Sequence, residues 1–217
     1  MHYILLLLIS ISCSHHQAGH DFANKHMHKT SHQQLISNFE DPKRDEWQKP
    51  ELVIKLISPV NGLEVIDIGV GSGYFAKHLL EAGARVTGAD VDEKFLQHTR
   101  KRFDENKYPD FSTLKIDYDN PKMKRAFFDM AFTSNTYHHI GSRVEYLKKV
   151  RAGLKPSGRV VVLDFKKSHD KKSHFGPPQS MRLAVETVVF ELKQAGFENI
   201  QVNIKDFIDH YLVIATK

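Results

Sequence analysis

The stretch that decides the fold is Val65-Ile66-Asp67-Ile68-Gly69-Val70-Gly71-Ser72-Gly73-Tyr74. An apolar run containing one carboxylate ends in three alternating glycines, and the amphipathic pattern of a helix follows at once. This order is typical of a buried parallel strand that turns into a helix beside a bound ligand. Glycine suits such a turn because it lacks a Cβ and adopts positive φ, so the backbone can approach the ligand closely.

A second carboxylate, Asp90, ends the next apolar run, which spans residues 84–89. In a βαβ nucleotide site, a carboxylate at this place holds ribose hydroxyls. A buried strand end rarely has a carboxylate without a partner, because an unpaired buried charge is costly. The two features together predict a ligand that contains a nucleoside.

The remaining chain alternates strand and helix patterns. Strands are predicted at 63–68, 85–89, 112–116, 130–133, 159–165, 199–205 and 211–215, and helices at 31–37, 73–81, 93–106, 143–153 and 185–195. A further helix starts at Pro50 and ends before Pro59, after a predicted loop over residues 39–50. Strands separated by helices form a parallel sheet covered on both faces, and the last two strands, with no helix between them, pair antiparallel. The expected fold is therefore α/β, a Rossmann-like seven-stranded sheet, mostly parallel with an antiparallel C-terminal edge hairpin and helices on both faces.

Composition narrows the class of protein. The 217 residues are 41% hydrophobic and 26% charged, which is ordinary for one soluble globular domain. The net charge of +5 comes from 31 basic and 26 acidic residues in scattered, interleaved clusters, so no nucleic-acid partner is predicted. A single cysteine excludes an internal disulfide and a multi-thiolate metal site, and no metal site is predicted.

The N-terminus has a separate pattern. Residues 4–9 form an apolar run too short to span a bilayer, followed by Ser10-Ile11-Ser12-Cys13. Small residues before a lone cysteine resemble the lipobox of bacterial lipoproteins, which implies a lipid anchor at Cys13 and a place in the bacterial cell envelope. Two alternatives stay open, ordinary secretion and a cytoplasmic protein. No Lys or Arg precedes the run, and Ser10 stands where the lipobox usually has Leu, Val or Ile.

Three segments are expected along the chain. Residues 1–13 form the signal-like segment. Residues 14–32 form a polar tether rich in histidine, for which weak binding of a transition metal is the alternative interpretation. Residues 33–217 form the domain, with a helical cover over 33–58 and the core over 59–217.

The glycine spacing separates two families of nucleotide site. A dinucleotide fold has Gly-x-Gly-x-x-Gly, whereas here Tyr74 stands at the third glycine position and Gly73 comes one residue earlier. Gly-x-Gly-x-Gly after Asp67 instead resembles the first motif of class I S-adenosylmethionine-dependent methyltransferases. An NAD(P)-dependent oxidoreductase is thus the distant alternative.

Further motifs of that family follow in order, so that the resemblance covers about residues 51–217: Asp90-Val91-Asp92, Ile116-Asp117-Tyr118, residues 128–140 and residues 154–165. The resemblance implies that Asp90 takes both ribose hydroxyls, that Val91 packs on the adenine and that Asp117 contacts its amino group. Asp67 either contacts the cofactor or fixes the glycine turn. The segment 22–50 resembles one in certain small bacterial methyltransferases, in which an Arg-Asp-x-Trp-Gln-Lys-Pro stretch, here residues 44–50, closes over the cofactor. The alternative role of Trp47 and Gln48 is a hydrophobic staple for the next helix.

The cofactor implied is S-adenosyl-L-methionine. Its expected contacts are Asp67, Gly69, Val70, Gly71, Ser72, Gly73, Asp90, Val91, Asp117, Tyr118, Asn135, Tyr137, Trp47 and Gln48. His138 or His139, just after the fourth strand, is the candidate general base, since imidazole titrates near neutrality. The alternative is that one histidine packs on the sheet and the other only lines the pocket.

A small molecule is the expected methyl acceptor. Enzymes that methylate amino groups of nucleobases or glutamine often have Asn-Pro-Pro-Tyr after this strand, where this chain has Asn135-Thr136-Tyr137-His138. Arsenite methylation needs several cysteines. The loop at 166–180 is a candidate lid over the acceptor. The alternative function is a catalytically silent envelope lipoprotein that binds S-adenosylmethionine or S-adenosylhomocysteine, and the oligomeric state stays open.

Overall fold

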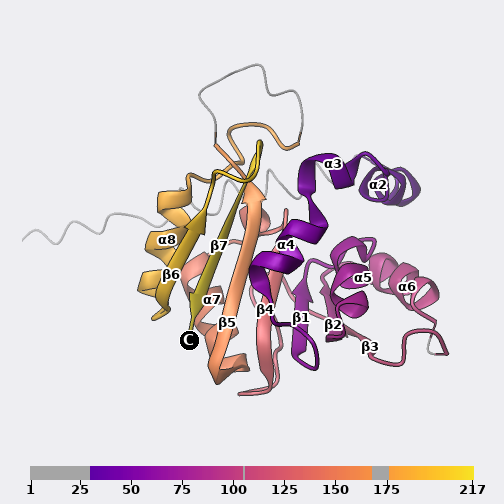
Figure 1. Cartoon of the computed structure of the whole chain (residues 1–217), viewed down its shortest axis with the longest axis horizontal. Helices are drawn as coiled ribbons and strands as arrows, with labels where there is room; N and C mark the ends of the chain where they lie inside the picture. Colours follow the sequence, from indigo (N-terminus) through magenta and orange to yellow (C-terminus); the bar gives the residue numbers. More distant parts are fainter. Residues whose placement is uncertain (1–29, 105, 168–175) are drawn as a thin grey trace, which may run out of the picture.

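Seven strands form one mixed sheet in the order β3-β2-β1-β4-β5-β7-β6 (Figure 1). The computed structural model describes residues 30–104, 106–167 and 176–217. The strands are β1 (Glu64–Ile68), β2 (Arg85–Asp90), β3 (Phe111–Lys115), β4 (Phe128–Ser134), β5 (Leu154–Phe165), β6 (Glu198–Asn203) and β7 (His210–Thr216).

The pairing matches the pattern that the sequence predicts. Strands β1 to β5 pair parallel with one another, whereas β7 pairs antiparallel with both β5 and β6. The predicted Rossmann-like sheet with an antiparallel C-terminal edge is confirmed. Strand β5 begins five residues before the predicted start, because Leu154 already pairs with Phe128 ahead of a register shift.

The helices also follow the predicted order. They are α2 (His32–Phe39), α3 (Arg44–Gln48), α4 (Pro50–Ile57), α5 (Tyr74–Glu81), α6 (Glu93–Arg102), the 3-10 turn η1 (Tyr137–His139), α7 (Arg143–Gly153) and α8 (Val185–Gln194). Ser31 caps α2 as expected, accepting a hydrogen bond from the Gln34 N–H.

Two predictions about helices are wrong. The predicted loop over residues 39–50 contains the short helix α3, which ends where Lys49 adopts the left-handed conformation at φ 49°. Helix α6 stops at Arg102, before the predicted end at 106, because Phe103 leaves the helix and packs in the core against Phe111, with ring centroids 4.5 Å apart.

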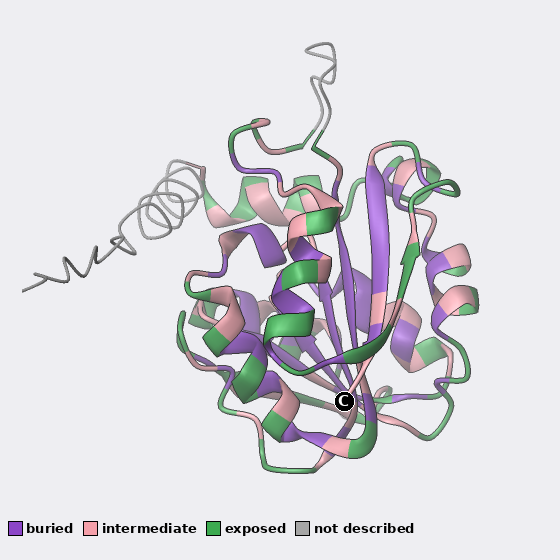
Figure 2. Ribbon diagram, turned by 90° about the vertical axis from the view of Figure 1, so that its left-hand side faces the viewer, coloured by how far each residue is buried: buried purple, intermediate pink, exposed green. Residues whose placement is uncertain are grey.

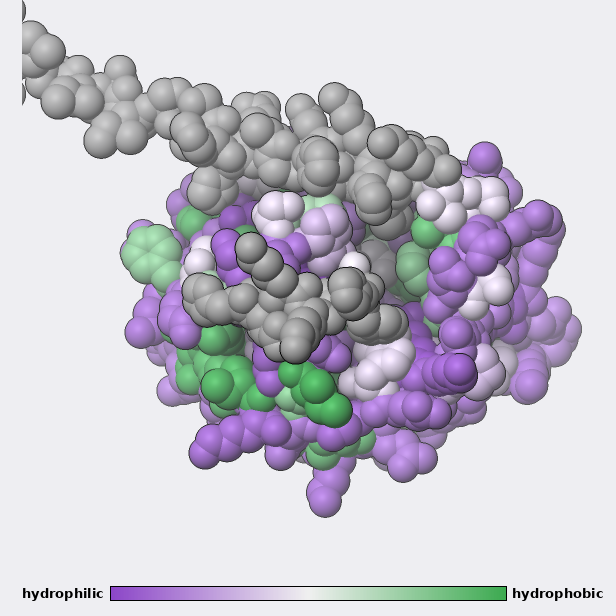
Figure 3. Space-filling view, turned by 90° about the horizontal axis from the view of Figure 1, so that it is seen from above, coloured by the Kyte–Doolittle hydropathy of each residue, from purple (hydrophilic) through white to green (hydrophobic). Residues whose placement is uncertain are grey.

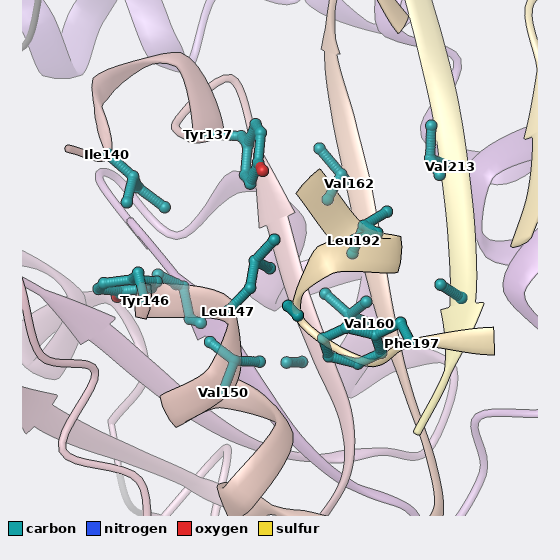
Figure 4. Packing of buried hydrophobic residues seen from close by; sticks show 14 of the residues in the cluster. Tyr137, Ile140, Tyr146, Leu147, Val150, Val160, Val162, Leu192, Phe197 and Val213 are labelled. Carbon is teal, nitrogen blue, oxygen red and sulfur yellow. The ribbon is translucent and has the colours of Figure 1, made fainter. Parts of the chain in front are cut away.

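The strands of the sheet are largely buried (Figure 2), and an apolar cluster lies on each of its faces. Helices α4, α5 and α6 cover one face, and α7 and α8 cover the other. Figure 4 shows the second cluster, in which Leu147 and Val150 of α7 and Leu192 of α8 meet Val160 and Val162 of β5. Strands buried on both faces explain the near-continuous apolar runs of the sequence.

The strand order places a site at one edge of the sheet. The order reverses between β1 and β4, and in such sheets ligands bind outside the carboxyl ends of the strands at this switch point. Helices α2 and α3 lie above that edge (Figure 1). The N-terminal helices, the glycine turn and the loop after β4 therefore meet there.

Several expectations fall on parts of the chain outside the described residues. They concern Cys13, the segment 1–13, most of the tether, and residues 168–175 of the candidate lid. Among the helices that the structure describes, none has the length and apolar character that a membrane span requires.

Candidate ligand-binding site

A cavity of about 980 Å³ opens at the carboxyl ends of β1, β2 and β4. This volume lies in the range of about 300–1,000 Å³ that is usual for small-molecule sites. Figure 3 views the molecule from above, toward the carboxyl ends of these strands, where residues of intermediate and high hydropathy lie among hydrophilic ones. The walls come mainly from the segment 30–47, the turn between β1 and α5, the ends of β2 and β3, and the loop after β4. The start of α6, the end of β5 and residues 176–181 also contribute.

The glycine turn forms the floor of the cavity. The N–H groups of Gly69 and Val70 both donate to the Ala89 carbonyl, at 2.8 and 3.0 Å, which ties the turn to β2. Gly69 has φ +79°, and a Cβ built there would lie 2.3 Å from Thr136 Oγ1. The turn is thus fixed between β2 and the loop after β4, with no room for a side chain.

Gly73 acts through packing. A Cβ at Gly73 would lie 2.6 Å from the Phe103 ring, so its absence allows the end of α6 to approach. Gly69, Val70, Gly71 and Ser72 line the cavity, whereas Gly73 is not among the lining residues. Four of the five expected contacts from this turn face the cavity.

Asp90 is the best-defined acceptor of the site. Its two carboxylate oxygens accept hydrogen bonds from the Gly71 N–H at 3.0 Å and the Asp92 N–H at 2.8 Å. The residue is buried, and burial raises its pKa to about 6, against the opposing effect of the two N–H groups. Each carboxylate oxygen retains acceptor capacity, since a carboxylate offers about four lone-pair positions.

Asp67 lies behind the turn as a second buried carboxylate. Burial raises its pKa to about 7, Arg44 lowers it, and Asp90 raises it again. Arg44 is the buried cation of the site: its guanidinium lies over the Tyr74 ring, with Cζ 3.9 Å from the centroid. Its Nη1 donates to the Phe39 carbonyl at 2.7 Å.

Helix α3 positions Arg44. Gln48 accepts from Arg44 Nε at 2.5 Å and donates to Ser134 Oγ at 2.8 Å, which links α3 to the end of β4. Gln48 is fully buried and is not among the cavity-lining residues. The sequence predicts a contact of Gln48 with the ligand, but its side chain instead holds Arg44 and Ser134 in place. Trp47 does line the cavity, and its ring stacks on His210 at 5.4 Å.

The loop after β4 splits its side chains between the cavity and the core. Asn135, His138 and His139 line the cavity. Tyr137 does not: it is 1% exposed, and its hydroxyl donates to Glu191 at 2.7 Å on the α8 side of the sheet. The expected side-chain contact of Tyr137 with the ligand is therefore wrong, because the 3-10 turn sends it into the core.

Val91, Asp117 and Tyr118 form the outer part of the cavity. The side chain of Asp117 is 53% exposed and pairs with Lys122 at 2.8 Å, and Tyr118 is 45% exposed. Val91 packs against the core beneath them.

Several lining residues were not predicted from the sequence. They are His32, Phe39, Arg44, Tyr74, Asp92, Thr136 and Phe165. Five of them, Arg44, Tyr74, Asp92, Thr136 and Phe165, belong to the quoted motifs and so had a signal, whereas His32 and Phe39 do not. The N-terminal residues have none, because their place in the site depends on contacts such as His32 with Asp92, at 2.6 Å across 60 positions.

The charged lining of the cavity is mainly acidic. Five aspartates line it among the described residues, Asp41, Asp67, Asp90, Asp92 and Asp117, against two basic side chains, Arg44 and Lys94. The electrostatic field of these side chains therefore disfavours binding of a polyanion and favours a ligand with positive charge.

Comparisons with known proteins agree with this arrangement. Residues 65–158 match the family described as "Methyltransferase domain". A tRNA U34 carboxymethyltransferase of Idiomarina loihiensis is 31% identical over 125 residues, 55% of this chain and 38% of the relative. A ubiquinone biosynthesis O-methyltransferase of Roseobacter denitrificans is 31% identical over 105 residues, 46% of this chain and 40% of the relative. The matches thus span about two fifths of these relatives.

Solved structures share the fold. A SAM-dependent methyltransferase from Aquifex aeolicus matches with a TM-score of 0.75 at 22% identity, covering 86% of this chain and 98% of that one. A phosphoethanolamine N-methyltransferase 2 of Haemonchus contortus, in complex with S-adenosyl-L-methionine, matches with a TM-score of 0.67 at 19% identity, covering 79% of this chain and 52% of that one.

The glycine turn gives a first prediction, in which Gly62→Ala is the matched control for Gly69→Ala. Both glycines have positive φ, but a Cβ at Gly62 meets nothing within 4 Å. Gly62→Ala should cost about 1–2 kcal/mol of unfolding free energy for the left-handed backbone. Gly69→Ala should cost about 1–3 kcal/mol more, because its Cβ overlaps Thr136. Urea denaturation measures both, and equal costs would contradict the tight turn.

The buried carboxylate gives a second prediction, on pH. Because the folded-state pKa of Asp67 is raised, to about 7, the native protein favours the protonated form. This contribution to stability is present below the ordinary pKa and is lost as pH rises through about 7. Asp67→Asn stays neutral, so its stability relative to the wild type should increase from pH 4 to pH 8, as measured by urea denaturation at each pH.

Asp129→Asn is the control for that titration. Burial raises the pKa of Asp129, but the hydrogen bonds from Lys155 and the Glu64 N–H lower it by more, so the pKa lies below its usual range. Its contribution to stability is lost only at acid pH, so the difference from the wild type should be flat from pH 5 to pH 8. A flat difference for Asp67→Asn as well would show that Asp67 does not titrate as described.

Proposed function

The chain contains a class I S-adenosylmethionine-dependent methyltransferase domain, and from this premise we propose that it transfers a methyl group from S-adenosylmethionine to a small-molecule acceptor. The observation that supports the proposal most directly is the buried Asp90 carboxylate, held at the cavity floor by the Gly71 and Asp92 N–H groups. S-adenosylmethionine supplies a sulfonium whose methyl group is electrophilic, and the protein binds it, orients the acceptor and excludes water.

The ribose of the cofactor is assigned to Asp90. A ribose presents two hydroxyl donors, and an ionised carboxylate is the strongest neutral-pH acceptor for such a pair. The two N–H groups that already bind Asp90 fix the carboxylate in place and favour its charged form. Val91 is assigned to the face of the adenine and Asp117, with Tyr118, to its outer edge.

The amino acid part of the cofactor is assigned to the glycine turn. It carries an ammonium and a carboxylate, and this end of the cavity offers the opposite charges in Asp67 and Arg44. Ser72 Oγ also lines this end and is buried with no hydrogen-bond partner among the described residues. A polar ligand beside the turn would satisfy this hydroxyl, since an unpaired buried hydroxyl is costly.

The acceptor proposed is a small molecule without a polyanionic backbone. The mainly acidic lining of the cavity supports this choice, because nucleic-acid sites attract phosphates with clustered basic side chains. Apolar side chains of Trp47, Phe165 and Met181 also line the cavity. A transfer RNA acceptor has support only from the names of relatives that match over about two fifths to one half of their length.

Calorimetry tests the proposal. The wild-type protein should bind both S-adenosylmethionine and S-adenosylhomocysteine, whereas Asp90→Ala should bind each at least about 100-fold more weakly, since it loses two charge-assisted hydrogen bonds of about 1.5–3 kcal/mol each. Asp110→Ala is the control, because Asp110 is exposed and precedes β3 at the opposite end of the sheet.

Two results would contradict the proposal. Absence of binding by the wild-type protein would exclude the cofactor assignment, and equal affinities in Asp90→Ala and the wild type would move the ribose elsewhere. Binding without transfer of labelled methyl to any component of a cell extract would favour the catalytically silent alternative.

A further inference from the structure

His138 and Asp164 form a buried pair at the wall of the cavity. His138 Nδ1 lies 2.8 and 3.0 Å from the two carboxylate oxygens of Asp164. His138 is 7% exposed and Asp164 is 1% exposed, and His138 lines the cavity. The two residues are 26 positions apart, on the loop after β4 and at the end of the neighbouring strand β5.

The hydrogen bonds of Asp164 fix the tautomer of the His138 imidazole. Asp164 also accepts from the His138 N–H at 3.0 Å and the Phe165 N–H at 2.7 Å. Burial raises the pKa of Asp164, but His138 and these N–H groups outweigh it and hold the pKa below its usual range. An ionised carboxylate only accepts, so Nδ1 carries a proton, and when the ring is neutral Nε2 keeps its lone pair.

The backbone that presents His138 is anchored from the other side of the sheet. Tyr137 donates to Glu191, and Arg143 donates to the same carboxylate from Nε, at 2.9 and 2.8 Å from its two oxygens, with Nη2 2.8 Å from Oε1. Arg143 also donates to the Ile140 carbonyl at 3.2 Å. Residues on both sides of His138 are therefore fixed, so the ring has a defined position at the cavity.

We infer that His138 is the general base of the reaction, that Asp164 positions it, and that the acceptor is a small aromatic molecule whose nucleophile is a hydroxyl. This inference rests on the proposed function. A base held in one tautomer is useful only when the nucleophile must lose a proton. The apolar side chains of Ile140, Phe165 and Trp47 line the same cavity as His138, and the rings of Phe165 and Trp47 stack on each other; these side chains suit an aromatic body better than a charged one.

The proton and the methyl group move in one balanced step. The hydroxyl oxygen forms a bond to the methyl carbon as the carbon–sulfur bond breaks, and that electron pair stays on sulfur. His138 Nε2 takes the hydroxyl proton, and Asp164 stabilises the imidazolium that results. The products are a methyl ether, the neutral thioether and protonated His138, which then releases its proton to water.

Catechol and pyridine are paired probes for this step. Catechol has a hydroxyl proton to lose, whereas pyridine attacks through a lone pair and loses none. His138→Gln should lower the ratio of the catechol rate to the pyridine rate at least about 100-fold, and Asp164→Asn more than about tenfold. His98→Gln is the control and should leave the ratio unchanged, because His98 lies on α6, pairs with Glu40 and is not among the cavity-lining residues. A ratio unchanged in His138→Gln would overturn the inference.

The ring nitrogens of His138 provide a readout that a purely structural role would not move. Nitrogen-15 spectra should show the Nδ1–H tautomer of His138 in the wild type and its loss in Asp164→Asn.

The outcomes separate this inference from the proposed function. An Nε2–H tautomer in the wild type would overturn the inference even if the cofactor binds. Methylation of pyridine but not catechol by the wild type would overturn the acceptor class. Failure to bind S-adenosylhomocysteine, by calorimetry, would instead overturn the proposed function, and the spectra of the free protein would still decide the tautomer.

Discussion

The tight turn at Gly69 is the constraint on which the site depends. Its N–H groups bind the Ala89 carbonyl, and the space where a side chain would lie is filled by Thr136. One residue therefore joins β1, β2 and the loop after β4, the three segments that form the cavity floor. The sheet places these segments at one edge because all three strands are parallel and the strand order reverses between β1 and β4.

Burial of charge is the second feature of this edge. Asp67, Asp90 and Arg44 are all buried, and burial shifts the pKa of each toward its neutral form. Burying charged groups costs free energy of folding. Such groups are typical of functional sites, where a ligand of matching charge offsets this cost. The same reasoning applies to Asp164 with His138, but there the partner is within the chain.

The sequence predicts the core of this fold well, because strands and long helices have periodic apolar patterns. It fails at α3, whose five residues are too few for a periodic pattern and whose end depends on the left-handed Lys49. The contacts of Arg44 with Tyr74 and of His138 with Asp164 join segments that are distant in the sequence, and no local pattern predicts such contacts. Tyr137 was misplaced for the same reason: a polar-tipped residue after a strand suggests the cavity, and only the buried partner Glu191 shows otherwise.

A crystal structure of the protein with S-adenosylhomocysteine tests the central claim most directly, which is that the glycine turn and Asp90 form a nucleoside site. We expect both ribose hydroxyls within hydrogen-bond distance of the Asp90 carboxylate and the amino acid part of the ligand against residues 69–72. A ligand bound elsewhere, or one whose ribose makes no contact with Asp90, would contradict it.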